Sequence, residues 1–153
     1  DRLLLDLLQE DAARSNVALS ELLKERKIEL KAAACGNRKE KLRENGYIRR
    51  ISAVLDHTKI GRPQMCFFVV NMVDQSDVAL ERFLATATAE PGITAIYETS
   101  GDWDFLLVGR VANMEGATSI SKKLRMGICN VVTHAVTGFP KEPGVVLLAA
   151  QHP

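Results

Sequence analysis

Apolar side chains in the first third of the chain recur every three or four positions, which is the spacing of one helix face. Leucines at this spacing predict a first helix over residues 2–10. A second helix is predicted to begin at Ser15 or Asn16, because either side chain can cap its first turn. A third is expected between residues 31 and 45, and Gly46 follows it where a helix favours a left-handed residue.

The pattern changes after the third helix. Residues 47–55 alternate in the manner of a strand. Three short helices followed by a strand are typical of a winged helix-turn-helix domain. We therefore predict this domain over residues 1–48 and a linker strand over residues 49–62, ending where Gly61 and Pro63 interrupt the pattern.

The second half of the chain contains continuous apolar runs of strand length. A helix after the first run would be capped by Ser76 or Asp77 and would stop at Pro91-Gly92. The predicted elements are strands over 65–72, 93–97, 105–111 and 131–137, and helices over about 77–90 and 114–126.

The predicted order of these elements, β-α-β-β-α-β, is the ferredoxin-like arrangement of the α+β class. Its antiparallel sheet carries both helices on one face. We expect this domain over residues 63–153, with a further strand over 145–150 that closes an edge or crosses to a partner chain. Because the other face of the sheet is left open and hydrophobic, we expect a homodimer.

The turn between the two central strands carries more chemistry than a turn requires. Its sequence is Thr99-Ser100-Gly101-Asp102-Trp103-Asp104, with two carboxylates and the only tryptophan of the chain. Ligands are often held by loops on rigid scaffolds, so these six residues are a candidate binding site. The alternative is that the two aspartates only form the turn and that Trp103 only contributes to packing.

Composition favours a globular protein. With 153 residues, the chain can form one or two small domains with a real core, and 46% hydrophobic and 25% charged residues are ordinary values. No apolar run approaches the roughly 20 residues that cross a bilayer. The first residues are amphipathic and do not resemble a signal peptide, so we expect a cytoplasmic protein with no membrane partner.

Cysteine and histidine spacing gives no sign of a metal site. Cys35, Cys66 and Cys129 include no closely spaced pair, so neither a disulfide framework nor a zinc site is indicated, and we expect them to be buried or half-buried. His57 and His134 have no cysteine or carboxylate beside them at ligand spacing. We therefore expect no metal, no cofactor and no catalytic residue.

The net charge of +1 hides an asymmetry. Up to Arg62 there are 14 Lys and Arg against 10 Asp and Glu, and from Pro63 onward there are 6 against 9. The basic residues of the first part cluster at Arg38, Lys39, Lys41, Arg43, Arg49 and Arg50. A basic face on a helical segment is typical of nucleic-acid binding, although a solvated helix face has the same composition.

Five short motifs follow one another along the chain, and their order and spacing are more specific than any one of them. They are Asp1-Arg2-x-Leu4-Leu5-x-Leu7-Leu8-Gln9-x-Asp11, Ser15-Asn16-Val17-x-Leu19, Leu42-x-x-x-Gly46-Tyr47-Ile48, Ala53-Val54-Leu55-Asp56-x-x-x-Ile60-Gly61 and Ser100-Gly101-Asp102-Trp103-Asp104-Phe105-Leu106-Leu107. With these motifs the chain resembles the leucine-responsive regulatory protein (Lrp/AsnC) family over nearly its whole length.

The resemblance implies a transcription regulator that binds double-stranded DNA through its N-terminal domain. It also implies an effector, typically an amino acid, bound by the C-terminal domain between dimers that assemble into octamers. Gly101, Asp102, Trp103 and Asp104 fall on the effector loop, beside Thr99 and Ser100. There a carboxylate would pair with an α-ammonium group, backbone N–H groups would take the α-carboxylate, and the aromatic ring would enclose the side chain.

In a winged helix-turn-helix domain the third helix enters the major groove, and the spacing of Lys31, Asn37, Arg38 and Lys41 predicts that they share its exposed face. Asn37 would read an adenine edge and Arg38 a guanine. Phosphate contacts would come from Lys31, Lys41, Arg49 and Arg50.

Around the third helix the chain departs from the family pattern. The segment between Leu19 and Gly46 is longer, so residues 24–31 form either a longer helix or a longer turn. Lys31 replaces the usual serine cap, and Lys39 occupies a normally apolar position from which it must snorkel. An altered docking on DNA is one consequence, and a sensing module with impaired DNA binding is the alternative.

A second alternative is an enzyme. The segment Ile48-Arg49-Arg50-Ile51-x-Ala53-Val54-x-x-His57 is similar to the linker of siroheme decarboxylases, which share this two-domain architecture. Those enzymes need a porphyrin-sized cavity with a general acid, and here a Gly-Asp-Trp-Asp hairpin replaces their Tyr-Asn-bearing strand. We therefore favour the regulator over the enzyme.

Overall fold

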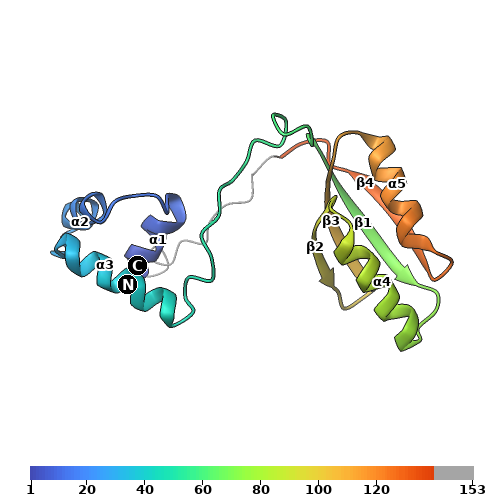
Figure 1. The fold of residues 1–153 in the computed structure, drawn as a ribbon, viewed down its shortest axis with the longest axis horizontal. Coiled ribbons are helices and arrows are strands. Elements are labelled where there is room, and N and C mark those ends of the chain that lie inside the picture. Colours follow the sequence, from blue (N-terminus) through green and yellow to red (C-terminus); the bar gives the residue numbers. More distant parts are fainter. Residues whose placement is uncertain (140–153) are drawn as a thin grey trace. The chain divides into compact units, whose positions relative to one another are not determined.

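A computed structural model of the chain describes residues 1–139. Within these residues the chain divides into two compact units, residues 1–53 and 54–139 (Figure 1). The strand expected over 145–150 lies outside the described residues.

Three helices form the first unit: α1 (Arg2–Glu10), α2 (Asn16–Glu25) and α3 (Ala32–Glu44). The Ser15 Oγ caps α2 by accepting a hydrogen bond from the Ala18 N–H at 3.1 Å. The core between the helices consists of Leu4, Leu7, Leu8, Leu19, Leu23, Cys35 and Leu42. Gly46 follows α3 with a φ of +77°, so the three predicted helices and this glycine are confirmed.

The strand expected over residues 47–55, which would form the wing and the linker strand, is not present. Ile51 and Val54 are 55% and 98% exposed, and no segment of residues 1–139 pairs with this one as a strand. An alternating pattern favours an extended chain, but a strand forms only where a neighbouring strand supplies hydrogen-bond partners. The segment therefore stays an irregular connection.

The second unit alternates strands and helices: β1 (Gln64–Met72), α4 (Asp77–Ala89), β2 (Ile93–Glu98), β3 (Phe105–Val111), α5 (Met114–Arg125) and β4 (Cys129–Ala135). The strands form one antiparallel sheet in the order β2-β3-β1-β4. This is the ferredoxin-like order that the sequence predicts. The largest shift is in β4, which spans Cys129–Ala135 rather than residues 131–137.

Both helices of this unit lie on the same face of the sheet (Figure 1). Side chains from alternate positions of β1 and β3 point toward them, including Phe68 and Leu107, which are fully buried. Phe83 of α4 packs against Phe105 of β3 with ring centroids 5.0 Å apart. The helices and the sheet thus share one core.

The opposite face of the sheet also carries apolar side chains. In the strand register Phe67 lies opposite Val108, and Val69 lies between Leu106 and Val132. Phe67 is half-buried and Val132 is 55% exposed. The sheet therefore has a second apolar surface that neither α4 nor α5 covers.

Candidate functional site

The turn between β2 and β3 is closed by hydrogen bonds at its base. The Thr99 N–H donates to the Asp104 carbonyl at 3.0 Å, and the Thr99 hydroxyl donates to the Trp103 carbonyl. Gly101 has a φ of +129°, a conformation that favours glycine. The six predicted residues thus form one compact turn beyond the end of the sheet.

Asp104 joins this turn to β1. Its N–H donates to the Val70 carbonyl at 3.0 Å, and its Oδ2 accepts a hydrogen bond from the Met72 N–H at 2.6 Å. The carboxylate therefore supplies an acceptor to β1 just past the last residue pair of the β1–β3 ladder. Asp104 therefore stabilises the hairpin by attaching the turn to β1.

The tip of the turn offers free polar groups. Ser100 and Asp102 are exposed, and Trp103 is 48% exposed. Among residues 1–139 the Asp102 carboxylate has no hydrogen-bond or ion-pair partner, and the N–H groups of residues 100–103 meet no protein acceptor. A carboxylate beside unpaired N–H donors is suited to a zwitterion.

Asn71 also belongs to this site, although the sequence pattern did not single it out. With its amide oriented to satisfy both acceptors, the Asn71 side chain donates to the carbonyls of Val70 and Asp102, each at 3.1 Å. The available signal was an amide side chain near the end of the apolar run of residues 65–72. It holds the backbone of Asp102 against the end of β1.

The predicted DNA contacts lie on α3 and directly before and after it. Asn37, Arg38 and Lys41 are exposed on the helix, and Arg49 and Arg50 are exposed after it. Lys31 is the residue before α3, which begins without a side-chain cap. Lys39 is half-buried beside the core, as its position in the apolar stripe predicts.

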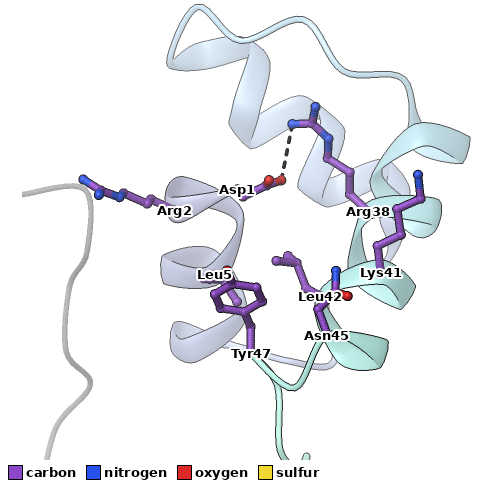
Figure 2. Close-up of a pocket in the computed structure, with 8 residues that line it drawn as sticks. All are labelled: Asp1, Arg2, Leu5, Arg38, Lys41, Leu42, Asn45 and Tyr47. Atoms are coloured by element: carbon purple, nitrogen blue, oxygen red, sulfur yellow. Dashed lines mark ion pairs between the residues drawn. The ribbon is translucent and has the colours of Figure 1, made fainter.

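A groove of about 670 Å³ lies between α1 and α3. Its lining consists of Asp1, Arg2, Leu5, Arg38, Lys41, Leu42, Asn45 and Tyr47 (Figure 2). Arg38 and Lys41 project from the same side of α3, and an Arg38 guanidinium nitrogen lies 3.4 Å from an Asp1 carboxylate oxygen. Both side chains are more than half exposed, so this ion pair is weak and leaves Arg38 available to a stronger anion.

The structure gives no metal-site geometry. Residues 1–139 contain no group of three or more His, Cys, Asp or Glu side chains placed to hold a metal ion. Cys35, Cys66 and Cys129 are buried, and burial raises the pKa of each thiol, so they stay protonated at neutral pH. No helix in the described part of the chain is long and apolar enough to cross a membrane.

Comparison with known proteins gives the family. Residues 65–146 match the model of the Lrp/AsnC ligand binding domain. An HTH-type transcriptional regulator of Haemophilus influenzae is 30% identical over 151 residues, covering 96% of this chain and 87% of that protein. The glutamate uptake regulatory protein of Zymomonas mobilis is 34% identical over 121 residues, covering 79% of this chain and 71% of that protein. These relatives are named as regulators, and the enzyme alternative is set aside.

Solved structures with the same fold match nearly the full length of the chain. The crystal structure of an AsnC family transcriptional regulator from Agrobacterium tumefaciens superposes with a TM-score of 0.85 at 25% identity, covering 99% of this chain and 97% of that one. A transcriptional regulator from Neisseria meningitidis, solved as a complex with L-methionine, shares the fold with a TM-score of 0.85 at 22% identity, covering 97% and 95%. The chain belongs to the Lrp/AsnC family of transcriptional regulators.

Proposed function

We propose that this protein binds double-stranded DNA through α3 and responds to an amino acid bound at the turn of residues 99–104. The observation that carries the DNA-binding part is the cationic face of α3. Arg38 and Lys41 project together from α3, which is held in place by Cys35 and Leu42 in the three-helix core. A helix held this way can enter the major groove without disturbing its own packing.

The contacts on DNA follow from side-chain chemistry. Asn37 and Arg38 offer the donors and acceptors that match adenine and guanine edges. Lys31, Lys41, Arg49 and Arg50 carry exposed charges that match phosphates. Arg38 would exchange its weak Asp1 partner for DNA, since a bidentate contact with guanine is the stronger interaction.

The effector part of the proposal concerns the tip of the hairpin. The Asp102 carboxylate would pair with the α-ammonium group, and the open N–H groups of residues 100–103 would receive the α-carboxylate. Trp103 would contact the effector's side chain. The Neisseria relative with bound L-methionine supports an amino acid as the class of effector.

Assembly is the third part of the proposal. The uncovered apolar face of the sheet, with Phe67, Val69 and Val132, is suited to a second copy of the same surface. We propose a homodimer through this face, with octamers built from dimers. Light scattering of the purified protein should give a mass above that of one 16.8 kDa chain, and a single-chain mass at micromolar concentration would exclude the dimer.

The DNA-binding proposal is tested by replacing both cations of α3. The double variant Arg38→Ala, Lys41→Ala should bind DNA from upstream of the protein's own gene at least about 10-fold more weakly in a gel-shift titration. The loss should shrink as the salt concentration rises, because the double variant neutralises fewer phosphates and its affinity therefore falls less steeply with salt than that of the wild type. Lys122→Ala is the matched control, since Lys122 is an exposed lysine on α5. Equal affinities of the wild type and the double variant would remove Arg38 and Lys41 from the interface.

A further inference from the structure

The connection from α2 to α3 begins with an ordered helix end. Arg26 caps α2, the Lys27 N–H donates to the Lys24 carbonyl at 2.9 Å, and the Ile28 N–H donates to the Leu23 carbonyl at 2.9 Å. These two bonds form the Schellman motif, in which the residue after the cap adopts the left-handed conformation. Lys27 is that residue, with a φ of +63°.

A lysine is unfavourable at this position. The left-handed conformation places a Cβ close to the following carbonyl, so glycine is the usual residue there. The chain follows this preference at the end of α3, where Gly46 has a φ of +77°. At the end of α2, by contrast, the corresponding residue is a lysine in a strained conformation. An outlier of this kind points to a function of the side chain.

The Lys27 side chain has no stabilising partner in the described structure. It is exposed, and within residues 1–139 it forms no ion pair and no side-chain hydrogen bond. What the lysine adds over glycine is therefore a positive charge on this turn.

Other cations share this place. Lys24, Arg26 and Lys31 are also exposed and without ion pairs in the described part of the chain, and only Glu25 and Glu29 lie among them in the sequence. The Ser20 hydroxyl donates to the Leu30 carbonyl at 2.5 Å, which ties the end of the connection to α2. We define residues 24–31 as the basic turn.

The basic turn leads directly into the start of α3. Lys31 precedes the first residue of the helix, and four residues of chain span at most about 14 Å, so Lys27 lies near this start. In helix-turn-helix proteins the N-terminal residues of the recognition helix contact the base edges. Phosphates that border the groove would therefore lie close to the basic turn.

We propose that the basic turn is an additional binding surface for the phosphodiester backbone of DNA, with Lys27 as its central contact. This inference rests on the proposed function of α3 and extends it to residues outside that helix. The contact is independent of base sequence, because a lysine meets phosphate as a point charge.

Three variants of the full chain test this proposal. Lys27→Gly removes the charge and relieves the strain, Lys27→Asn removes the charge in a residue that tolerates the left-handed conformation, and Lys122→Ala is the control on α5. DNA affinity is measured against salt by fluorescence anisotropy on two unrelated duplexes, one of them from upstream of the protein's own gene.

For Lys27→Gly and Lys27→Asn alike, affinity near 0.1 M salt should fall about 3-fold to 10-fold on both duplexes. The plot of log affinity against log salt, which slopes downward, should become shallower by about one unit of slope. At the same time the thermal midpoint of Lys27→Gly should rise by a few degrees, because the strain is removed. A variant that is more stable and yet binds more weakly separates a DNA contact from a folding defect.

Both Lys27 variants could show an unchanged slope while the double substitution in α3 still weakens binding. That result would overturn the proposed DNA contact of the basic turn and leave the proposed function intact. A loss confined to one duplex would also overturn it, because a phosphate contact carries no sequence preference. Failure of the wild type to bind either duplex at low salt would overturn both proposals.

Discussion

Asp102 and Asp104 are neighbours in one turn, but their carboxylates have different surroundings. The Asp104 Oδ2 accepts the Met72 N–H at 2.6 Å and is half-buried. The Asp102 carboxylate is exposed and has no partner among the described residues. The first therefore contributes to stability, and the second is available to a ligand.

Alanine at each position should separate these contributions. Asp104→Ala should lower the free energy of unfolding by about 1–3 kcal/mol, because it leaves the Met72 N–H unpaired. Asp102→Ala should change it by less than about 0.5 kcal/mol. Calorimetric titration with L-methionine, and then with the other standard amino acids, should show binding at least about 10-fold weaker in Asp102→Ala. Unchanged stability of Asp104→Ala, or wild-type binding by Asp102→Ala, would contradict the assignment.

The sequence predicted this turn as a candidate site but did not distinguish its two aspartates. Their difference arises from the β1–β3 register, which sets Val70 opposite Phe105 and so brings Met72 to Asp104. Asn71 was missed for the same reason, since its amide reaches Asp102 only through the pairing of distant strands. The local sequence pattern therefore predicts which residue types occur in the turn, but their contacts depend on the pairing of strands that are distant in the sequence.

At the scale of elements, an ion pair links the end of α4 to α5. The Lys123 Nζ donates to the Glu90 Oε2 at 2.7 Å, and the Glu90 Oε1 accepts the Gly92 N–H at 3.2 Å. The pKa of Glu90 lies below its usual value, mainly because of the hydrogen bond from Lys123. Partial burial of the carboxyl group raises the pKa but does not cancel this effect. The folded state thus favours the charged carboxylate.

This lowered pKa predicts a loss of stability in acid. The contribution of Glu90 is present above its unfolded pKa and is lost as the pH falls through the lower folded pKa. Because Lys123 is 58% exposed, the contribution is at most about 1 kcal/mol. Between about pH 5 and pH 3 the thermal midpoint of Glu90→Gln should therefore fall less steeply than that of the wild type. Parallel curves for the two proteins would show that Glu90 does not contribute.

The helices were predictable because their signals are local. Ser15 and Ser76 cap α2 and α4, and Gly46 ends α3, as the spacing of leucines and cap residues indicates. The strand expected over 47–55 failed because a strand depends on a partner, which local alternation does not supply. The left-handed Lys27 was likewise invisible, since no rule of composition places a lysine in a glycine position.

At the scale of the whole molecule, the protein consists of two units with separate chemistry. Residues 1–53 carry the cationic α3 and the basic turn, and residues 54–139 carry the sheet and the turn that we propose binds an amino acid. The fold of both units was predictable, because the five motifs extend across them in order. Assembly stays a prediction that rests on the uncovered apolar face of the sheet.

The central claim is that an amino acid at the turn of residues 99–104 changes DNA binding by α3. The most direct measurement is the Kd of the full chain for DNA from upstream of its own gene, with and without L-methionine and each other standard amino acid. At least one amino acid should shift the Kd of the wild type about 5-fold or more. The Kd of Asp102→Ala should match the wild type without amino acid and should not shift with it. Equal shifts in both proteins, or none in the wild type, would contradict the claim.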